Sequence, residues 1–395
     1  MGKYSENKNL YIIALIAIVN ALGYGIIIPV LYTYSQKYGL TDFQNGLLFA
    51  LFSICQFLST PIIGRMSDKY GRRPLLLASL AGTAISFFMM AFAPTAIFLF
   101  LARALDGITA GNIPVASAVI TDTTDEKNRA KGFGVIGASF GFGFIFGPAI
   151  TAFTVRFGQS VPFIIAGIIS VLAVIVTALL LPETNKHMGE VKKGKLFDFK
   201  SMAKALTDPN VGPTLLITLV YATAFSLLIY AFQPFAVKGL HLGVDTIALL
   251  FTLVGVAGLI TQIVILPWVT KKWHIKDVFT NSLLIISFIF VLIFFSMNLY
   301  YYAIVTMIWA LVNSLINPLI QTILSQETDA RSQGAMQGLN ASYMSIGQIV
   351  GPILGGAVAS IGISYPFLLG GAFALACYFL SFRVLRKGVA KEDAF

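Results

Sequence analysis

The chain has 395 residues, of which 57% are hydrophobic and 11% are charged, and its mean hydropathy is +0.83. Soluble proteins carry about 25% charged residues, and a soluble globule of this length could not bury so much apolar surface, so the composition predicts an integral membrane protein. The formal net charge of +10 is compatible with nucleic-acid binding. The positions of the basic residues along the chain decide whether that explanation is needed.

Twelve apolar runs along the chain are long enough to cross a bilayer, for which a helix needs about 20 residues. Polar breaks separate these runs, and the break after the sixth run is the longest. We therefore expect an all-α integral membrane protein with twelve transmembrane helices, near residues 10–32, 44–63, 75–93, 96–120, 132–154, 160–181, 211–236, 245–269, 278–297, 300–324, 334–359 and 363–384.

Positive charges are distributed unequally between the two sides that these spans define. If both termini are cytoplasmic, 23 of the 27 lysines and arginines lie on the cytoplasmic side, and only Lys37, Arg156 and Lys238 lie outside. Lysine and arginine accumulate in the cytoplasmic loops of membrane proteins. The pattern predicts a multi-pass protein of the cell (inner, or cytoplasmic) membrane with both termini inside, and it explains the basic balance without a nucleic-acid partner.

The long polar break between Pro182 and Asn210 divides the spans into two sets of six. It contains six lysines, and we expect a cytoplasmic linker with a short amphipathic helix around Phe197–Leu206. The predicted domains are an N-terminal six-helix bundle at 1–181, the linker at 182–210 and a C-terminal six-helix bundle at 211–395.

The two sets of spans repeat one another at an offset of 202 to 205 residues. Two halves of the same orientation imply a parallel repeat about an axis along the membrane normal, and the seam between them is then the moving part. The clearest correspondence is that of Gly143-x-x-x-Gly147-Pro148 in span 5 with Gly347-x-x-x-Gly351-Pro352 in span 11.

A glycine-rich charged loop joins spans 2 and 3, and reads Gly64-Arg-Met-Ser-Asp68-Lys-Tyr-Gly71-Arg72-Arg73-Pro74. Its glycines permit a tight reversal of the chain. We expect Asp68 to accept bonds from a neighbouring helix N-terminus and Arg72 to bind the carboxylate of Asp122 at the inner end of span 4. A basic loop that only sets the topology is the alternative. The predicted conformational latch comprises Gly64, Asp68, Gly71, Arg72, Arg73 and Asp122.

Span 4 carries the deepest charges of the chain, Arg103 and Asp106. A charge at the centre of a bilayer costs about 2.5–3.5 kcal/mol even on the most lenient scale, so it faces a cavity or a partner. Residues three apart share a helix face. We predict that Arg103 contacts substrate and that Asp106, with Arg103, couples transport to protons. A self-neutralising pair that only holds span 4 against its neighbours is the alternative.

Spans 5 and 11 carry small residues at every third or fourth position, which lets another helix approach closely, and their prolines can bend them. Close packing by itself would explain these glycines. The predicted helix-packing motif comprises Gly143, Gly147, Pro148, Gly347, Gly351 and Pro352.

These motifs resemble those of the major facilitator superfamily and of its drug:proton antiporter branch. The loop after span 2 is similar to the signature G-x-x-x-D-[KR]-x-G-R-[KR], Arg103-x-x-x-Gly107 to the second motif, and span 5 to the third motif, whose last two glycines are Thr151 and Ala152 here. The chain also resembles bacterial tetracycline-resistance efflux proteins over nearly its whole length. The resemblance implies the major facilitator fold and proton-driven export.

The same resemblance places the coupling carboxylates of those efflux proteins in spans 1, 3 and 9. This chain has Asn20 and Ser86 at the first two places and no acid in 278–297, so transport of a tetracycline–metal chelate by that chemistry is not expected. Asp106 is then the carboxylate that lies deep enough to carry a proton.

Polar residues recur at helical spacing in three spans, where they are predicted to line a substrate cavity. A single amide in a span contacts a neighbouring helix as commonly as it contacts cargo. The predicted substrate-binding residues are Asn20 and Tyr24 in span 1, Arg103 in span 4, Tyr230 and Gln233 in span 7, and Asn313, Asn317 and Gln321 in span 10.

The sequence as a whole predicts a monomeric secondary transporter that works by alternating access. We expect it to export hydrophobic or amphipathic small molecules in exchange for protons, with membrane lipids around it. Two cysteines in apolar runs, three scattered histidines and no Walker motif predict no enzyme activity, no cofactor and no metal. A lipid, sugar or metabolite carrier on the same scaffold, as a symporter or uniporter, is the alternative, and a receptor is the alternative from another class.

Overall fold

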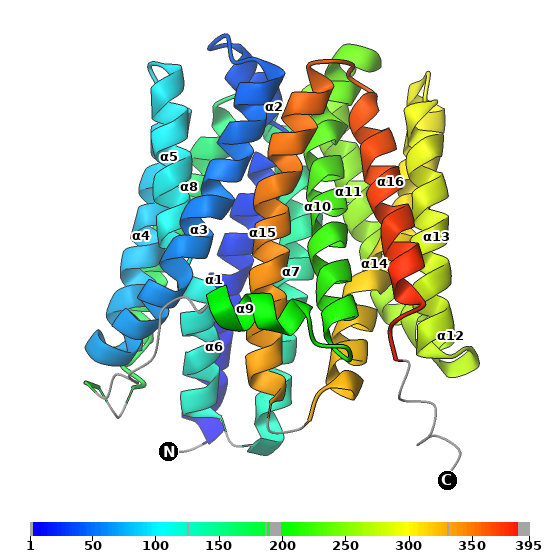
Figure 1. Ribbon diagram of the computed structural model, residues 1–395. Coiled ribbons are helices and arrows are strands. Elements are labelled where there is room, and N and C mark those ends of the chain that lie inside the picture. The colour runs from blue at the N-terminus through cyan, green and yellow to red at the C-terminus, as the bar shows by residue number, and fades with distance from the viewer. Residues whose placement is uncertain (1–2, 125, 186–187, 190–198, 330–331, 386–395) are drawn as a thin grey trace. The chain divides into compact units, whose positions relative to one another are not determined.

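The computed structural model describes residues 3–124, 126–185, 188–189, 199–329 and 332–385, and over these residues the chain is helical and has no strand (Figure 1). Eleven helical segments in this part of the chain are long and apolar enough to cross a membrane, and the 17-residue α16 is a shorter apolar helix. The predicted all-α class is confirmed. The helices are α1 (Lys3–Ile27), α2 (Leu31–Gln36), α3 (Asp42–Tyr70), α4 (Arg72–Ala91), α5 (Ala96–Thr109), α6 (Asn112–Thr123), α7 (Glu126–Thr154), α8 (Val161–Leu180), α9 (Phe199–Leu206), α10 (Gly212–Pro234), α11 (Val244–Ile260), α12 (Leu266–Lys272), α13 (Ile275–Phe294), α14 (Leu299–Glu327), α15 (Gln333–Ala359) and α16 (Tyr365–Ser381).

Four predicted spans differ locally from a continuous α-helix. Span 1 is interrupted between the end of α1 at Ile27 and the start of α2 at Leu31. Span 4 is split into α5 and α6, and span 7 ends in a π-helical turn over Phe235–Gly239. Span 8 consists of α11, a π-helical turn over Thr261–Ile265 and α12. Pro267 has no backbone N–H and its ring would crowd the preceding turn of an α-helix, so the wider π-helical turn lies where the regular ladder cannot continue. The predicted linker helix is α9.

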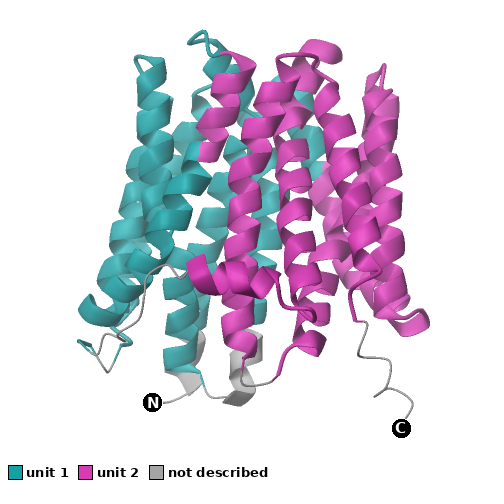
Figure 2. Ribbon diagram, viewed as in Figure 1, with its two compact units in different colours: residues 1–40, 51–197, 243–252 teal, residues 41–50, 198–242, 253–395 magenta. Residues whose placement is uncertain are grey.

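The chain divides into two compact units, which Figure 2 distinguishes by colour. Unit 1 comprises residues 1–40, 51–197 and 243–252, and unit 2 comprises 41–50, 198–242 and 253–395. The first turns of α3 therefore group with unit 2, and those of α11 with unit 1. The sequence repeat predicts six-helix bundles at 1–181 and 211–395, and this division of the chain remains a prediction.

In unit 1, α1 packs on α7 and α8, and α4 packs on α5 and α8. The core contains Ile13 and Ile16 from α1, Leu80 from α4 and Val119 from α6, all of them fully buried. In a lipid environment such contacts stabilise by van der Waals packing, because lipid chains are as apolar as these side chains.

Unit 2 uses the corresponding helix pairs. Here α10 packs on α15 and α16, and α13 packs on α16 and α14. The pair α10–α15 corresponds in the repeat to α1–α7, and the pair α13–α16 corresponds to α4–α8. Equivalent contacts in both units agree with the internal repeat read from the sequence.

Candidate functional site

The fourth predicted span is interrupted in its middle, between Thr109 and Asn112. The backbone N–H of Ala110 donates to the carbonyl oxygens of Asp106 (2.8 Å) and Gly107 (3.3 Å), which ends α5. The next helix then starts afresh at Asn112. An interrupted helix frees backbone groups, and within a membrane these groups need partners from the protein.

Hydroxyl side chains of neighbouring helices occupy carbonyl oxygens at this break. Ser59 of α3 donates to the carbonyl oxygen of Gly107 at 3.1 Å, and Ser79 of α4 donates to that of Thr109. Gly107 also lets α3 approach closely, because a Cβ atom there would overlap the carbonyl oxygen of Phe52. The break is thus built into the packing of unit 1.

Directly before the break lies a buried ion pair. Nη1 of Arg103 lies 3.2 Å from Oδ2 of Asp106, and the two residues are 2% and 6% exposed. The guanidinium carbon lies 4.3 Å from the centroid of the Phe52 ring, within the range of a cation–π contact. The described residues provide no hydrogen-bond partner for the buried Nε of Arg103, so this donor of the pair is unused.

The carboxylate of Asp106 faces α4, where the hydroxyls of Thr83 and Ser86 lie beside it. Ser86 occupies the place in span 3 where the resemblance implies an acid in the tetracycline-resistance proteins. The carboxylate in this part of the protein therefore comes from the neighbouring helix. Among the described residues, no group of three or more His, Cys, Asp or Glu side chains could hold a metal ion.

On another side of Arg103, aromatic residues border the ion pair. The Tyr24 ring lies edge-on to that of Phe144, with centroids 5.8 Å apart, and 6.4 Å from that of Phe52. Tyr24 is 36% exposed, and Cys55 of α3, which lies beside Arg103, is partly exposed. These four side chains and Arg103 provide an apolar surface with one cation.

Two asparagines connect the start of α6 to α1. Nδ2 of Asn112 donates to Oδ1 of Asn20 at 2.9 Å, and Nδ2 of Asn20 donates to the carbonyl oxygen of Ile16 at 2.8 Å. Asn112 is fully buried, and the described residues provide no partner for its Oδ1. The sequence interpretation missed Asn112, although an amide directly after Gly111 within an apolar run is a signal for a helix contact.

In unit 2, two of the predicted substrate-binding residues are buried. Tyr230 is 1% exposed and its hydroxyl donates to the carbonyl oxygen of Asp42, while Gln233 is 0% exposed. In this structure both side chains lie in the packed interior of the unit, because α15 and the first turns of α3 cover α10 there. Their contact with substrate remains a prediction.

The three predicted residues of α14 lie on its more open side. Oδ1 of Asn313 accepts from the hydroxyl of Tyr221 at 2.6 Å, and Asn313 is partly exposed. Asn317 and Gln321 are exposed. All three are therefore accessible in unit 2, and their role in substrate binding also remains a prediction.

The charged loop between α3 and α4 brings three predicted latch residues together. Nη1 of Arg72 lies 2.5 Å from Oδ1 of Asp68, and Nε lies 3.2 Å from Oδ2 of Asp122. The same guanidinium donates to the hydroxyl of Ser67 at 2.7 Å. Arg72 thus contacts the partner expected for it, and the function of this cluster as a latch remains a prediction.

Glu183, which the sequence interpretation missed, binds the other end of this loop. Its carboxylate accepts from the backbone N–H groups of Arg72 (2.9 Å) and Arg73 (3.1 Å) at the start of α4, where the helix dipole favours an anion. This role was expected for Asp68. Gly71 has φ +104°, and the carboxylate of Glu183 fills the space that a Cβ atom there would need. The signal in the sequence is an acid directly after span 6.

The predicted packing glycines lie at the closest helix contacts in both units. In unit 1, a Cβ atom at Gly143 would overlap Ala21, and one at Gly147 would lie 2.8 Å from Cα of Gly25. In unit 2, Gly347 and Gly351 of α15 meet α10 in the same way. Pro148 and Pro352 lie inside α7 and α15.

The first turn of α3 is fixed within unit 2. Thr41 and Gln44 form a reciprocal cap, with hydrogen bonds of 2.9 Å and 3.3 Å. Asp42 pairs with Lys238 at 2.7 Å. A Cβ atom at Gly356, which completes the glycine pair in span 11, would lie 2.8 Å from the carbonyl oxygen of Asp42.

Comparison with known proteins agrees with this arrangement. The family model described as Major Facilitator Superfamily matches residues 13–211 and 214–394. The chain is 31% identical to the class B tetracycline resistance protein of Escherichia coli over 88% of each chain. It is 30% identical to multidrug resistance protein 1 of Bacillus subtilis (strain 168), over 92% of this chain and 93% of that protein.

Among solved structures, a bacterial homolog of the human lysosomal transporter Spinster, in an inward-facing and unoccupied conformation, is similar in fold. The TM-score is 0.76 at 17% identity, and the match covers 98% of this chain and 99% of the other. At this identity the likeness concerns the fold alone.

Proposed function

The chain belongs to the major facilitator superfamily, and on this basis we propose that it is a proton-coupled exporter of hydrophobic or amphipathic small molecules. It works by alternating access as a monomer in the cell membrane, with both termini in the cytoplasm. The resistance proteins that it resembles support export as the direction, and the distribution of lysine and arginine supports the orientation.

The observation that carries the proposal is the buried pair of Arg103 and Asp106 at the broken fourth span. A buried carboxylate without a counter-charge is far more stable when protonated. When cargo or a conformational change draws Arg103 away, Asp106 takes up a proton, and it releases the proton when the pair forms again. Moving one charge across 100 mV is worth about 2.3 kcal/mol, which is enough to bias the cycle.

The surroundings of Arg103 support an apolar cargo that is uncharged or weakly cationic. Tyr24, Phe52 and Phe144 offer aromatic area, and sites of this kind hold ligands by area and a few polar contacts. A polyanion would need several cations, whereas Arg103 is the one cation beside these aromatic rings. Competition by a panel of dyes and drugs of different charge, measured in the transport assay, tests this class.

Proton coupling is tested with Asp106→Asn in proteoliposomes under an imposed pH gradient. We expect this variant to lose gradient-driven uptake and to retain downhill exchange of cargo, because the amide cannot carry a proton. Asp277→Asn is the matched control, since Asp277 is exposed at the start of α13, and it should behave as the wild type. Unchanged pH-driven transport in Asp106→Asn would show that the protein is a uniporter or couples elsewhere.

A further inference from the structure

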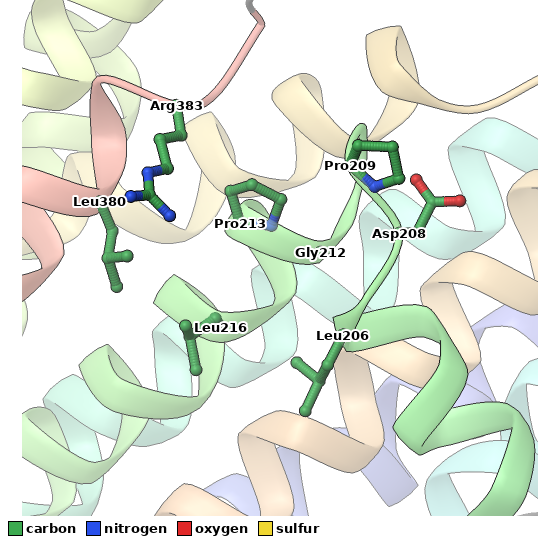
Figure 3. Close-up of a pocket in the computed structure, with 8 residues that line it drawn as sticks. All are labelled: Leu206, Asp208, Pro209, Gly212, Pro213, Leu216, Leu380 and Arg383. Carbon is green, nitrogen blue, oxygen red and sulfur yellow. The ribbon is translucent and has the colours of Figure 1, made fainter.

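A pocket of about 430 Å³ lies in unit 2 (Figure 3). Its walls come from the turn between α9 and α10, the first turns of α10 and the end of α16. The lining combines apolar side chains with one acid and one base, and includes Leu206, Asp208, Pro213, Leu216, Leu380 and Arg383.

The pocket lies at the level where apolar helices end. Gly212 begins one membrane-length helix, and Ser381 ends α16. The neighbouring side chains of Phe379 and Phe382 are 62% and 47% exposed, so apolar surface reaches the rim of the pocket, where Asp208 and Arg383 supply charge. A molecule that fills this pocket meets both phases, so it must be amphipathic.

The base in the pocket is available for a ligand. Arg383 is exposed, and in the view of Figure 3 its guanidinium lies between Leu380 and Pro213. Among the residues that the structure describes, no hydrogen-bond or ion-pair partner of its guanidinium is found. Guanidinium groups bind phosphate oxygens through two parallel hydrogen bonds. At the membrane boundary, phospholipid headgroups supply such phosphate groups.

The acid in the pocket narrows the kind of headgroup. Oδ1 of Asp208 accepts from the backbone N–H groups of Asn210 (2.8 Å) and Val211 (3.3 Å), which fixes the carboxylate before α10. A fixed negative charge repels a headgroup that is only anionic and attracts an ammonium group that can donate hydrogen bonds to it. One base and one acid together therefore match a headgroup that carries a phosphate and a primary ammonium.

We propose that this pocket binds a membrane phospholipid with a phosphoethanolamine headgroup. Arg383 binds the phosphate, Asp208 binds the ammonium, and the acyl chains pass along Leu216 and Leu380. The site joins the segment after the linker helix to the last span, both of which belong to unit 2. It is independent of the cargo and of the proton.

The test is native mass spectrometry of the purified full-length protein, which is first stripped of lipid and then given equal amounts of dioleoyl phosphatidylethanolamine, phosphatidylcholine or phosphatidylglycerol. The wild type should retain phosphatidylethanolamine in preference to both others. Loss of a hydrogen-bonded charge pair should weaken its retention about ten-fold in Arg383→Gln. In Asp208→Asn, which keeps an oxygen for the two backbone N–H groups, the preference over phosphatidylcholine should disappear. Lys271→Gln, an exposed cation at the end of α12, is the control and should bind as the wild type.

Equal retention by Arg383→Gln and the wild type would overturn the proposal, as would equal retention of all three lipids by the wild type. Soluble phosphoethanolamine that displaces the lipid at equal concentration would assign the pocket to a free phosphate ester instead. Circular dichroism establishes first that each variant is folded. If Arg383→Gln does not fold, Arg383→Lys keeps the charge without the planar fork, and retention equal to that of the wild type would then contradict the proposed phosphate contact.

Discussion

Arg103 and Asp106 depend on each other because both are buried in a medium of low dielectric constant. Removing one member of such a pair leaves an uncompensated charge, which is more costly than losing the pair as a whole. In the proposed cycle, cargo would offer a hydrogen-bond acceptor to Nε of Arg103, for which the described residues provide no partner.

We therefore predict that Arg103→Ala lowers the free energy of unfolding by about 3–5 kcal/mol. The double variant Arg103→Ala/Asp106→Asn should recover a large part of this loss, because no buried charge is left. Thermal unfolding in detergent measures both. A double variant that is no more stable than Arg103→Ala would contradict the view that the charge, and not the lost packing, causes the effect.

Glu183 is a second single residue with a large expected effect. Replacing it with Ala leaves two backbone N–H groups at the start of α4 without a partner, which we expect to cost about 1–2 kcal/mol and to slow transport several-fold. Glu183→Gln should lie between Ala and the wild type, because it keeps an acceptor and loses the charge. Flux and unfolding temperature are measured together. Wild-type values in Glu183→Ala would show that the contact contributes neither to stability nor to transport.

Residue spacing predicted that Arg103 and Asp106 share a face, and the pair does so. Asn112 and Glu183 were missed because their importance depends on groups that are distant in sequence, Asn20 on α1 and the start of α4. Tyr230 fits the spacing of a cavity residue, yet it is buried in this structure because α3 and α15 cover it.

At the scale of the element, the interruption of span 4 is the main departure from the sequence interpretation. Residues 96–120 form one apolar run, and glycines at 107 and 111 are tolerated in membrane helices. The break is stabilised by Ser59 and Ser79, which belong to other helices. The sequence of this run therefore does not show where the helix breaks. Discontinuous helices of this kind surround the binding sites of many transporters.

The contact of α7 with α1 gives a prediction with an internal control. Gly147→Ala would place a Cβ atom 2.8 Å from Cα of Gly25, and we expect such overpacking to cost about 1–3 kcal/mol. At Gly141, on the same helix, a Cβ atom would meet no atom within 4 Å, so Gly141→Ala should be neutral or slightly stabilising. Thermal unfolding of the two variants compares them directly. Equal unfolding temperatures would mean that α7 and α1 adjust without cost.

At the scale of the whole molecule, the twelve apolar runs, the repeat and the linker helix were all predictable, because each rests on composition or periodicity over many residues. The boundaries of the two compact units were not predictable from the sequence. The first turns of α3 group with unit 2 through the ion pair of Asp42 with Lys238, the hydrogen bond from Tyr230 to the carbonyl oxygen of Asp42 and the close approach of Gly356. These contacts involve residues far apart in the chain and no repeated pattern.

The latch hypothesis also belongs to this scale, since it concerns the transport cycle. Asp68→Asn removes the ion pair with Arg72 (2.5 Å), and we expect it to impair transport while expression and folding stay near normal. We predict that this cluster holds the outward-open state, and the variant would weaken that hold. Lys271→Gln, an exposed cation at the end of α12 and outside the motif, is the control. Wild-type flux in Asp68→Asn would refute the latch.

The chain has two cysteines, and their surroundings differ sharply. Cys377 is fully buried, whereas Cys55 is partly exposed and lies beside Arg103. A maleimide applied to the unmodified protein should therefore label a single place, next to the ion pair. Its labelling rate, measured with and without cargo, reports how accessible Cys55 is in each condition. Conformational change next to the ion pair can therefore be followed without introducing another cysteine.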